Sequence, residues 1–153
     1  MTFRLRPLLT MATAGLLAPG LSPAASADNA PDGSLLYRQE CGSCHTAFPP
    51  QLLPPASWSA LMNDLPHHFG TDASLEPEVR RRLAAWLAGQ GAAGRPRPEA
   101  DRITRSGWFR HEHSELAPTV WSRPSVKSPS HCGACHASAD SGVFDEHNVR
   151  IPR

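Results

Sequence analysis

All four cysteines of the chain lie in two copies of one five-residue pattern, CGSCH at 41–45 and CGACH at 132–136. Each copy ends in a histidine directly after its second cysteine. Four cysteines could form two disulfides or a zinc site, and a CxxC could also be a thioredoxin-type redox pair. None of these needs that histidine, and paired CxxC zinc motifs usually lie only about 15–20 residues apart.

Covalent attachment of c-type haem does require this histidine. Both thiols add to the vinyl groups of the haem, and the adjacent imidazole binds the iron from the same side. The pattern therefore predicts two covalently bound haem c groups. The residues that would hold them are Cys41, Cys44 and His45 for haem 1, and Cys132, Cys135 and His136 for haem 2.

The N-terminus has the three-part build of a secretory signal peptide. Arg4 and Arg6 precede an apolar run over 7–17, and small residues follow as far as Ala27. This pattern predicts cleavage after Ala27 and export to the periplasm. The apolar run is short for a membrane anchor, and no later segment approaches the ~20 apolar residues of a membrane span, so we expect no transmembrane segment in the mature chain.

The mature chain is expected to form two small lobes. Residues 28–90 would form an N-terminal haem c lobe and 103–153 a C-terminal one. Between them, 91–102 has the Gly, Pro and charged composition of a linker. Few residues are β-branched, which disfavours a large sheet. We therefore expect a mostly α fold, a small two-lobed c-type cytochrome of short helices and long Pro-rich loops, packed around haems that supply much of the apolar core.

Helix signals recur between Pro-rich segments. Asp32 or Ser34 can cap the first helix, and Ser57 can cap the second. Prolines between 46 and 57 predict an extended connector. The expected helices cover 34–45, 58–65, 75–88, 104–116 and 132–140.

The charge of the mature chain is close to balanced. Without Arg4 and Arg6 it has one more acidic than basic residue. Such a balance provides no electrostatic footprint for nucleic acid or for an anionic membrane.

The sixth iron ligand decides what the haems can do. Met1 and Met11 leave with the signal peptide, so Met62 is the one methionine of the mature chain, and its helix predicts a core position. Histidines remain in surplus, which favours two axial histidines at each iron and low redox potentials. The histidines outside the two motifs are His67, His68, His111, His113, His131 and His147.

Spacing limits the choice among these histidines. His67 and His68 are adjacent, so only one of them can face haem 1. His111 and His113 lie roughly 200° apart on a helix, so again only one can face a given iron. His131 abuts Cys132 and is poorly placed to reach the far side of haem 2, and His147 lies in the C-terminal tail.

Three blocks of the sequence, at 37–75, 101–115 and 126–152, resemble the bacterial dihaem cytochrome c family. The resemblance implies His68 as the distal ligand of haem 1 and His113 as that of haem 2. Two positions depart from the family pattern. Pro66 stands where a helix-compatible residue is expected, and His131 stands where the family tends to have Asn, which makes His131 a rival ligand.

The resemblance also implies a small electron carrier rather than an enzyme, with other redox proteins as partners. Some family members are paired with a membrane cytochrome b and a small oxygen-binding monohaem cytochrome c. Two haem alternatives remain: a peroxidase or small-ligand reductase with one open iron, and a gas-binding module whose distal histidine leaves. A disulfide-stabilised domain is the alternative without haem.

Overall fold

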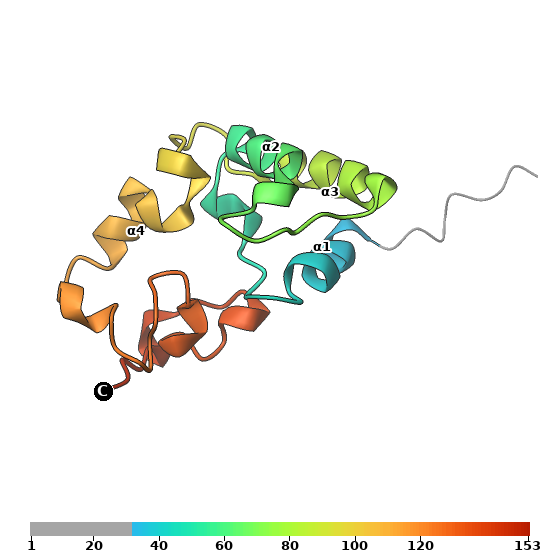
Figure 1. The fold of residues 1–153 in the computed structure, drawn as a ribbon. Helices are drawn as coiled ribbons and strands as arrows, with labels where there is room; N and C mark the ends of the chain where they lie inside the picture. The colour runs from blue at the N-terminus through green and yellow to red at the C-terminus, as the bar shows by residue number, and fades with distance from the viewer. Residues whose placement is uncertain (1–31) are drawn as a thin grey trace, which may run out of the picture. The chain divides into compact units, whose positions relative to one another are not determined.

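The computed structural model describes residues 32–153, and the predicted signal peptide lies outside this range. Short helices make up the regular structure, and these residues contain no strand, so the mostly α prediction is confirmed (Figure 1). The four α-helices are α1 (Gly33–Cys41), α2 (Pro55–Asn63), α3 (Pro77–Gln90) and α4 (Gly107–Glu112). The 3-10 turns are η2 (Pro50–Leu52), η3 (Leu65–His67), η4 (Glu99–Asp101), η5 (Ile103–Arg105), η6 (Pro118–Val120), η7 (Cys132–Ala134), η8 (Ala139–Ser141) and η9 (Glu146–Asn148).

A capping side chain explains where the first helix begins, and a proline explains where the second begins. The Asp32 side chain accepts a hydrogen bond from the Ser34 amide and caps α1, as one of the two predicted caps. The expectation that Ser57 caps the second helix is wrong. α2 already begins at Pro55, because proline fits the first helical turn, and Ser57 is buried inside the helix.

The other helices are shorter or shifted compared with the sequence prediction. α1 ends at Cys41 rather than at 45, and α3 covers 77–90 rather than 75–88. α4 begins at Gly107 rather than at 104, because the Ser106 hydroxyl accepts from the Phe109 amide and caps the helix there, and it ends at Glu112. The helix predicted over 132–140 is wrong, since η7 and η8 are single 3-10 turns.

The main core lies where α1 and α2 pack against α3 (Figure 1). Tyr37 lies at its centre, with its ring near those of Trp58 and Trp86 and its hydroxyl donating to the Phe48 carbonyl at 2.6 Å. The buried members of this cluster are Leu36, Tyr37, Leu53, Trp58, Met62, Leu65, Leu83 and Leu87. The C-terminal part buries far fewer apolar side chains, which are Phe109, Val120, Val126 and Ala139.

The segment predicted as a linker lies against the N-terminal helices. The Ala92 amide donates to the Leu53 carbonyl at 3.0 Å, and η4 contacts α2. Gly91 approaches the Pro55 backbone so closely that a Cβ atom would collide with it. Residues 32–153 belong to one compact unit, while the predicted lobe boundaries stay a prediction.

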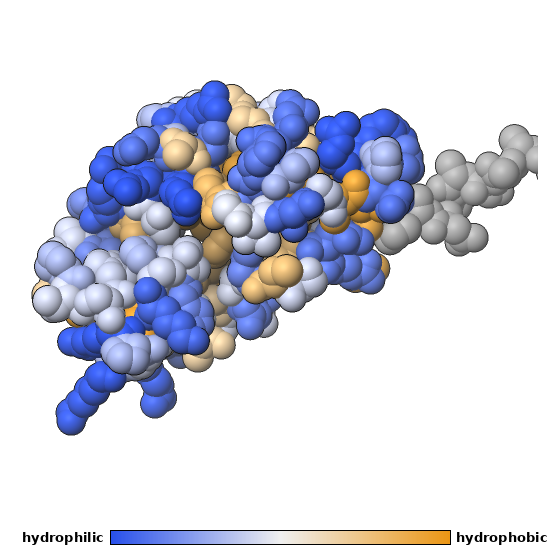
Figure 2. Space-filling view, viewed as in Figure 1, coloured by the Kyte–Doolittle hydropathy of each residue, from blue (hydrophilic) through white to orange (hydrophobic). Residues whose placement is uncertain are grey.

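Hydrophilic residues cover most of the face shown in Figure 2, and apolar residues reach the surface in small, separate areas. Within residues 32–153, no helix combines the length and the apolar character needed to cross a membrane.

Candidate cofactor site

The first CxxCH motif begins at the last residue of α1. The Gly42 amide donates to the Arg38 carbonyl at 3.1 Å, and a Cβ atom at this position would collide with that same oxygen. Gly42 thus allows the chain to turn sharply out of the helix. Cys41 stays half-buried beside the core, while Cys44 and His45 are exposed.

The second motif forms the turn η7 and is held by the C-terminal tail. The amides of Cys135 and His136 both donate to the Cys132 carbonyl, at 3.1 and 2.9 Å. The Arg150 amide donates to the Cys135 carbonyl at 2.9 Å, and Val149 forms a β-bridge with His136. The C-terminal tail therefore supports this motif.

Each motif histidine faces one further histidine. The ring centroids of His45 and His68 lie 6.1 Å apart, and their planes differ by 14°. The centroids of His113 and His136 also lie 6.1 Å apart, with an angle of 75° between the planes. The structure thus brings together the four histidines named from the sequence as two separate pairs.

The spacing within each pair suits two ligands of one metal. A histidine nitrogen binds a transition metal at about 2 Å and lies about 1 Å from its ring centre, so two axial imidazoles have centroids about 6 Å apart. A zinc site would need about four protein ligands. Residues 32–153 contain no group of three or more His, Cys, Asp or Glu that could hold a bare metal. A haem fits better, because the porphyrin supplies four ligands and the protein needs to add only two.

The ring nitrogens also fit this use. Nδ1 of His45 lies 2.7 Å from the Thr46 carbonyl and Nδ1 of His113 lies 2.8 Å from the Phe109 carbonyl, which leaves Nε2 free to bind a metal. Burial is the main cause that lowers the pKa of His68 and of His136. Both imidazoles are therefore neutral at pH 7, the form in which histidine binds a metal.

No two of the four cysteines form a disulfide, so the structure does not support the disulfide alternative. Burial raises the pKa of Cys41 to about 11, and it also raises the pKa values of Cys132 and Cys135. Before haem is attached, these thiols would therefore be protonated at neutral pH, beside the motif histidines.

Two cavities adjoin the motifs. A cavity of about 330 Å³ contains both His113 and His136 and is lined by apolar side chains such as Trp121 and Phe144. A second cavity, of about 570 Å³, lies between the two motifs, where the Thr46 hydroxyl donates to Asp140 at 2.8 Å. His131 lines both cavities.

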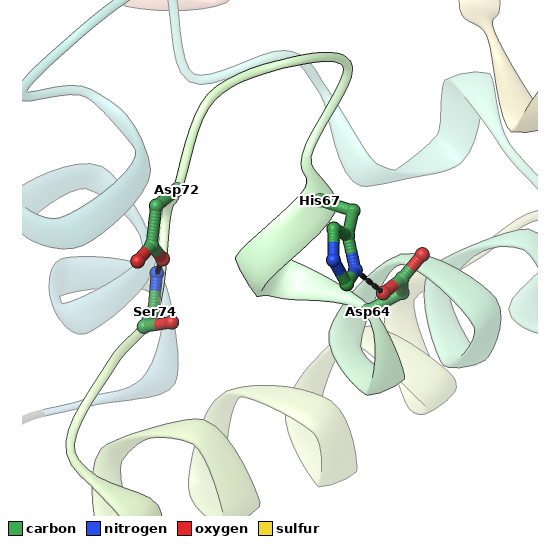
Figure 3. Close-up of polar contacts among 4 residues, drawn as sticks. All are labelled: Asp64, His67, Asp72 and Ser74. Atoms are coloured by element: carbon green, nitrogen blue, oxygen red, sulfur yellow. Dashed lines mark hydrogen bonds and ion pairs between the residues drawn. The ribbon is translucent and has the colours of Figure 1, made fainter.

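Apart from His131, whose Nδ1 lies 3.0 Å from the Val126 carbonyl, the remaining candidate ligands lie elsewhere. Nδ1 of the exposed His67 bonds to Asp64 at 2.7 Å, beside the Asp72–Ser74 turn (Figure 3). His111 and His147 are exposed, and Met62 is buried in the core.

Three aromatic neighbours of the paired histidines carry no signal in the sequence. The ring of Phe48 lies 5.0 Å from that of His45, and Phe144 lies 5.4 Å from His136. Phe109 lies 4.1 Å from His113. They come together only through the fold.

Comparisons with known proteins agree with this geometry. The family model for dihaem cytochrome c matches residues 37–144. The crystal structure of the dihaem cytochrome c from Shewanella baltica OS155 is 38% identical, with a TM-score of 0.70 over 79% of this chain and 94% of that one. Two structures of the Rhodobacter sphaeroides protein are 42% and 38% identical, with TM-scores of 0.63 and 0.64. Each covers 72% of this chain, and this chain covers 96% and 95% of theirs. No curated protein matches the chain.

Proposed function

Because this chain belongs to the dihaem cytochrome c family and carries two haem c groups, we propose that it is a periplasmic electron carrier with two axial histidines at each iron. Haem 1 would be attached to Cys41 and Cys44, and haem 2 to Cys132 and Cys135. The axial pairs would be His45 with His68 and His113 with His136. The observation that carries this proposal is the 6.1 Å spacing within both pairs.

When bound, each haem supplies an iron that takes up and releases one electron. The two proposed histidines of each pair would hold the iron from both sides, so that it would pass electrons rather than bind a substrate. The carbonyls of Thr46 and Phe109 hold one imidazole of each pair in orientation. Phe144 and Trp121 provide an apolar wall at haem 2.

The two motifs approach each other closely, which supports electron transfer within the chain. The bond between Thr46 and Asp140 links the segment after the first motif to the segment after the second, and His131 lies beside both motifs. We propose that electrons enter at one haem and leave at the other.

Other redox proteins of the periplasm are the proposed partners, including a membrane cytochrome b and a small monohaem cytochrome c. The periplasmic location rests on the signal sequence over 1–27, outside the described residues. The alternative is an enzyme or gas-binding protein with one open iron.

A potentiometric titration of the purified holoprotein tests the carrier role. We expect two reversible one-electron steps, both at potentials below those of His/Met cytochromes, since methionine ligation raises the potential. The exposed His67→Ala variant is the matched control and should titrate like the wild type. One high-potential step, or steady turnover of peroxide, would favour the open-iron alternative.

A further inference from the structure

The two proposed distal histidines are held in different ways. Nδ1 of His113 lies 2.8 Å from the Phe109 carbonyl, and its backbone amide donates to the same oxygen. The His113 ring also lies 4.1 Å from the ring of Phe109 and 5.7 Å from that of Trp121. Hydrogen bonds and packing on α4 therefore fix this imidazole.

His68 has no comparable support. Its Nδ1 is buried and has no hydrogen-bond partner among residues 32–153. Besides His45, its one aromatic neighbour is Phe69, whose ring is 4.8 Å away and 42% exposed. A histidine whose second nitrogen is not bonded is both less well oriented and less basic as a ligand.

The backbone around His68 is also short of regular structure. His68 ends the single turn η3, and a tight turn follows, closed by the bond from the Thr71 amide to the His68 carbonyl. Phe69 has a φ of 52° and Gly70 a φ of 97°. Such a conformation is strained for phenylalanine, so a change in this turn can release strain.

The motif histidines cannot leave their irons in the same way. His45 follows Cys44 directly and His136 follows Cys135, so attachment of the haem to these cysteines keeps both imidazoles at the iron. Among the four axial histidines, His68 is thus the one secured by neither a covalent neighbour nor a bond to Nδ1.

We propose that haem 1 is a binding site for small neutral ligands of reduced iron, such as carbon monoxide or nitric oxide, and that departure of His68 opens it. The inference rests on the proposed axial pairs and adds a second property to one of the haems. In the exchange, the bond between iron and His68 breaks and a bond between iron and ligand forms. No electron is transferred, and His68 leaves as a neutral imidazole.

Arg102 controls how easily this turn opens. Its guanidinium lies 4.0 Å from the centre of the Phe69 ring, a cation–π contact next to His68. An exposed contact of this kind slows opening by about two- to fivefold. Removing it with Arg102→Ala should accelerate ligand binding by that factor without altering either axial pair.

Carbon monoxide binding to the dithionite-reduced holoprotein tests the proposal by stoichiometry and rate. The wild type should bind one molecule per chain, at a rate that levels off with concentration because His68 must leave first. His68→Ala should still bind one, at least tenfold faster and with no levelling off. His113→Ala should bind two, because haem 2 is then open as well. His67→Ala should behave like the wild type.

Other results would overturn the inference. Two molecules per chain for His68→Ala would mean that haem 2 exchanges its ligand. Two molecules of carbon monoxide per wild-type chain would mean that both haems exchange a ligand. No bound carbon monoxide would mean that His68 stays on the iron, and the carrier role would stand. A high-spin haem in the oxidised wild type, before any ligand is added, would instead contradict the proposed axial pairs. If His68→Ala does not take up haem, an unchanged rate in Arg102→Ala contradicts the proposal.

Discussion

The imidazole planes of His45 and His68 lie within 14° of each other, whereas those of His113 and His136 are 75° apart. When the two imidazole planes are aligned, both rings interact with the same iron d orbital. The energy of this orbital then differs from that of the second d orbital available to an imidazole. Crossed imidazoles interact with both orbitals and leave their energies nearly equal. Two sites with the same pair of ligands should therefore differ in the magnetic properties of their ferric haems.

Electron paramagnetic resonance of the oxidised protein should show this difference. We expect a rhombic low-spin signal from haem 1 and a strongly anisotropic low-spin signal from haem 2. His68→Ala should remove the rhombic signal, and His113→Ala the anisotropic one. Two indistinguishable signals in the wild type would contradict the geometry of the pairs.

The neighbours His67 and His68 offer a matched pair of substitutions. His67 points outward to Asp64 (Figure 3), so His67→Ala should leave the visible spectrum and the melting temperature unchanged. His68→Ala should convert one of the two haems to a high-spin form, because it removes the proposed axial ligand. Optical spectra of both variants show which of the two histidines binds the iron of haem 1. A high-spin band in His67→Ala would mean that His67, not His68, is the ligand.

Substitutions of Met62 test whether this residue belongs to the core or binds iron. It is 3% exposed within the cluster formed by α1, α2 and α3. Met62→Ala should lower the free energy of unfolding by about 2–5 kcal/mol, while Met62→Leu should cost less than about 1.5 kcal/mol.

Neither Met62 variant should alter the spectrum or potential of a folded haem site. Denaturant titration followed by potentiometry measures both properties on the same sample. A raised spin state in Met62→Leu would show that the sulfur binds iron.

Tyr37 is the chain's one tyrosine, so its ionisation can be followed alone. Burial raises its pKa well above 10. Because the unfolded chain loses this proton first, the stability contributed by Tyr37 is complete below about pH 10 and is lost as the pH rises further. Tyrosinate absorbance should appear only together with unfolding.

The absorbance of the Tyr37→Phe variant is the baseline to subtract from that of the wild type. The variant also lacks the hydrogen bond to the Phe48 carbonyl. It should lower the free energy of unfolding by about 0.5–1.5 kcal/mol. Titration of Tyr37 near pH 10 in the folded protein would mean that the ring is exposed.

A haem-attachment pattern can be recognised from a sequence more directly than the ends of a helix. The Cys41, Cys44 and His45 pattern is set by covalent chemistry, and a local pattern suffices to recognise it. The start of α2 could not be found in the same way. Ser57 is a suitable N-cap and Pro55 is a suitable first-turn residue, so the sequence permits both starts, and packing decides between them.

Residue spacing does not predict contacts between segments that are far apart in the sequence. Spacing left His67 and His68 equivalent, and the bond from His67 to Asp64 distinguishes them only in the folded chain. The bond between Thr46 and Asp140 joins positions 94 residues apart, so the approach of the two motifs also depends on the fold.

The central claim is that both irons carry two histidines. Near-infrared magnetic circular dichroism of the oxidised holoprotein tests it most directly, because the energy of the charge-transfer band depends on the axial ligand pair. We predict the band of a bis-histidine haem with the intensity of two haems per chain, and no high-spin feature. A histidine–methionine band, or a high-spin haem in the untreated protein, would contradict the account.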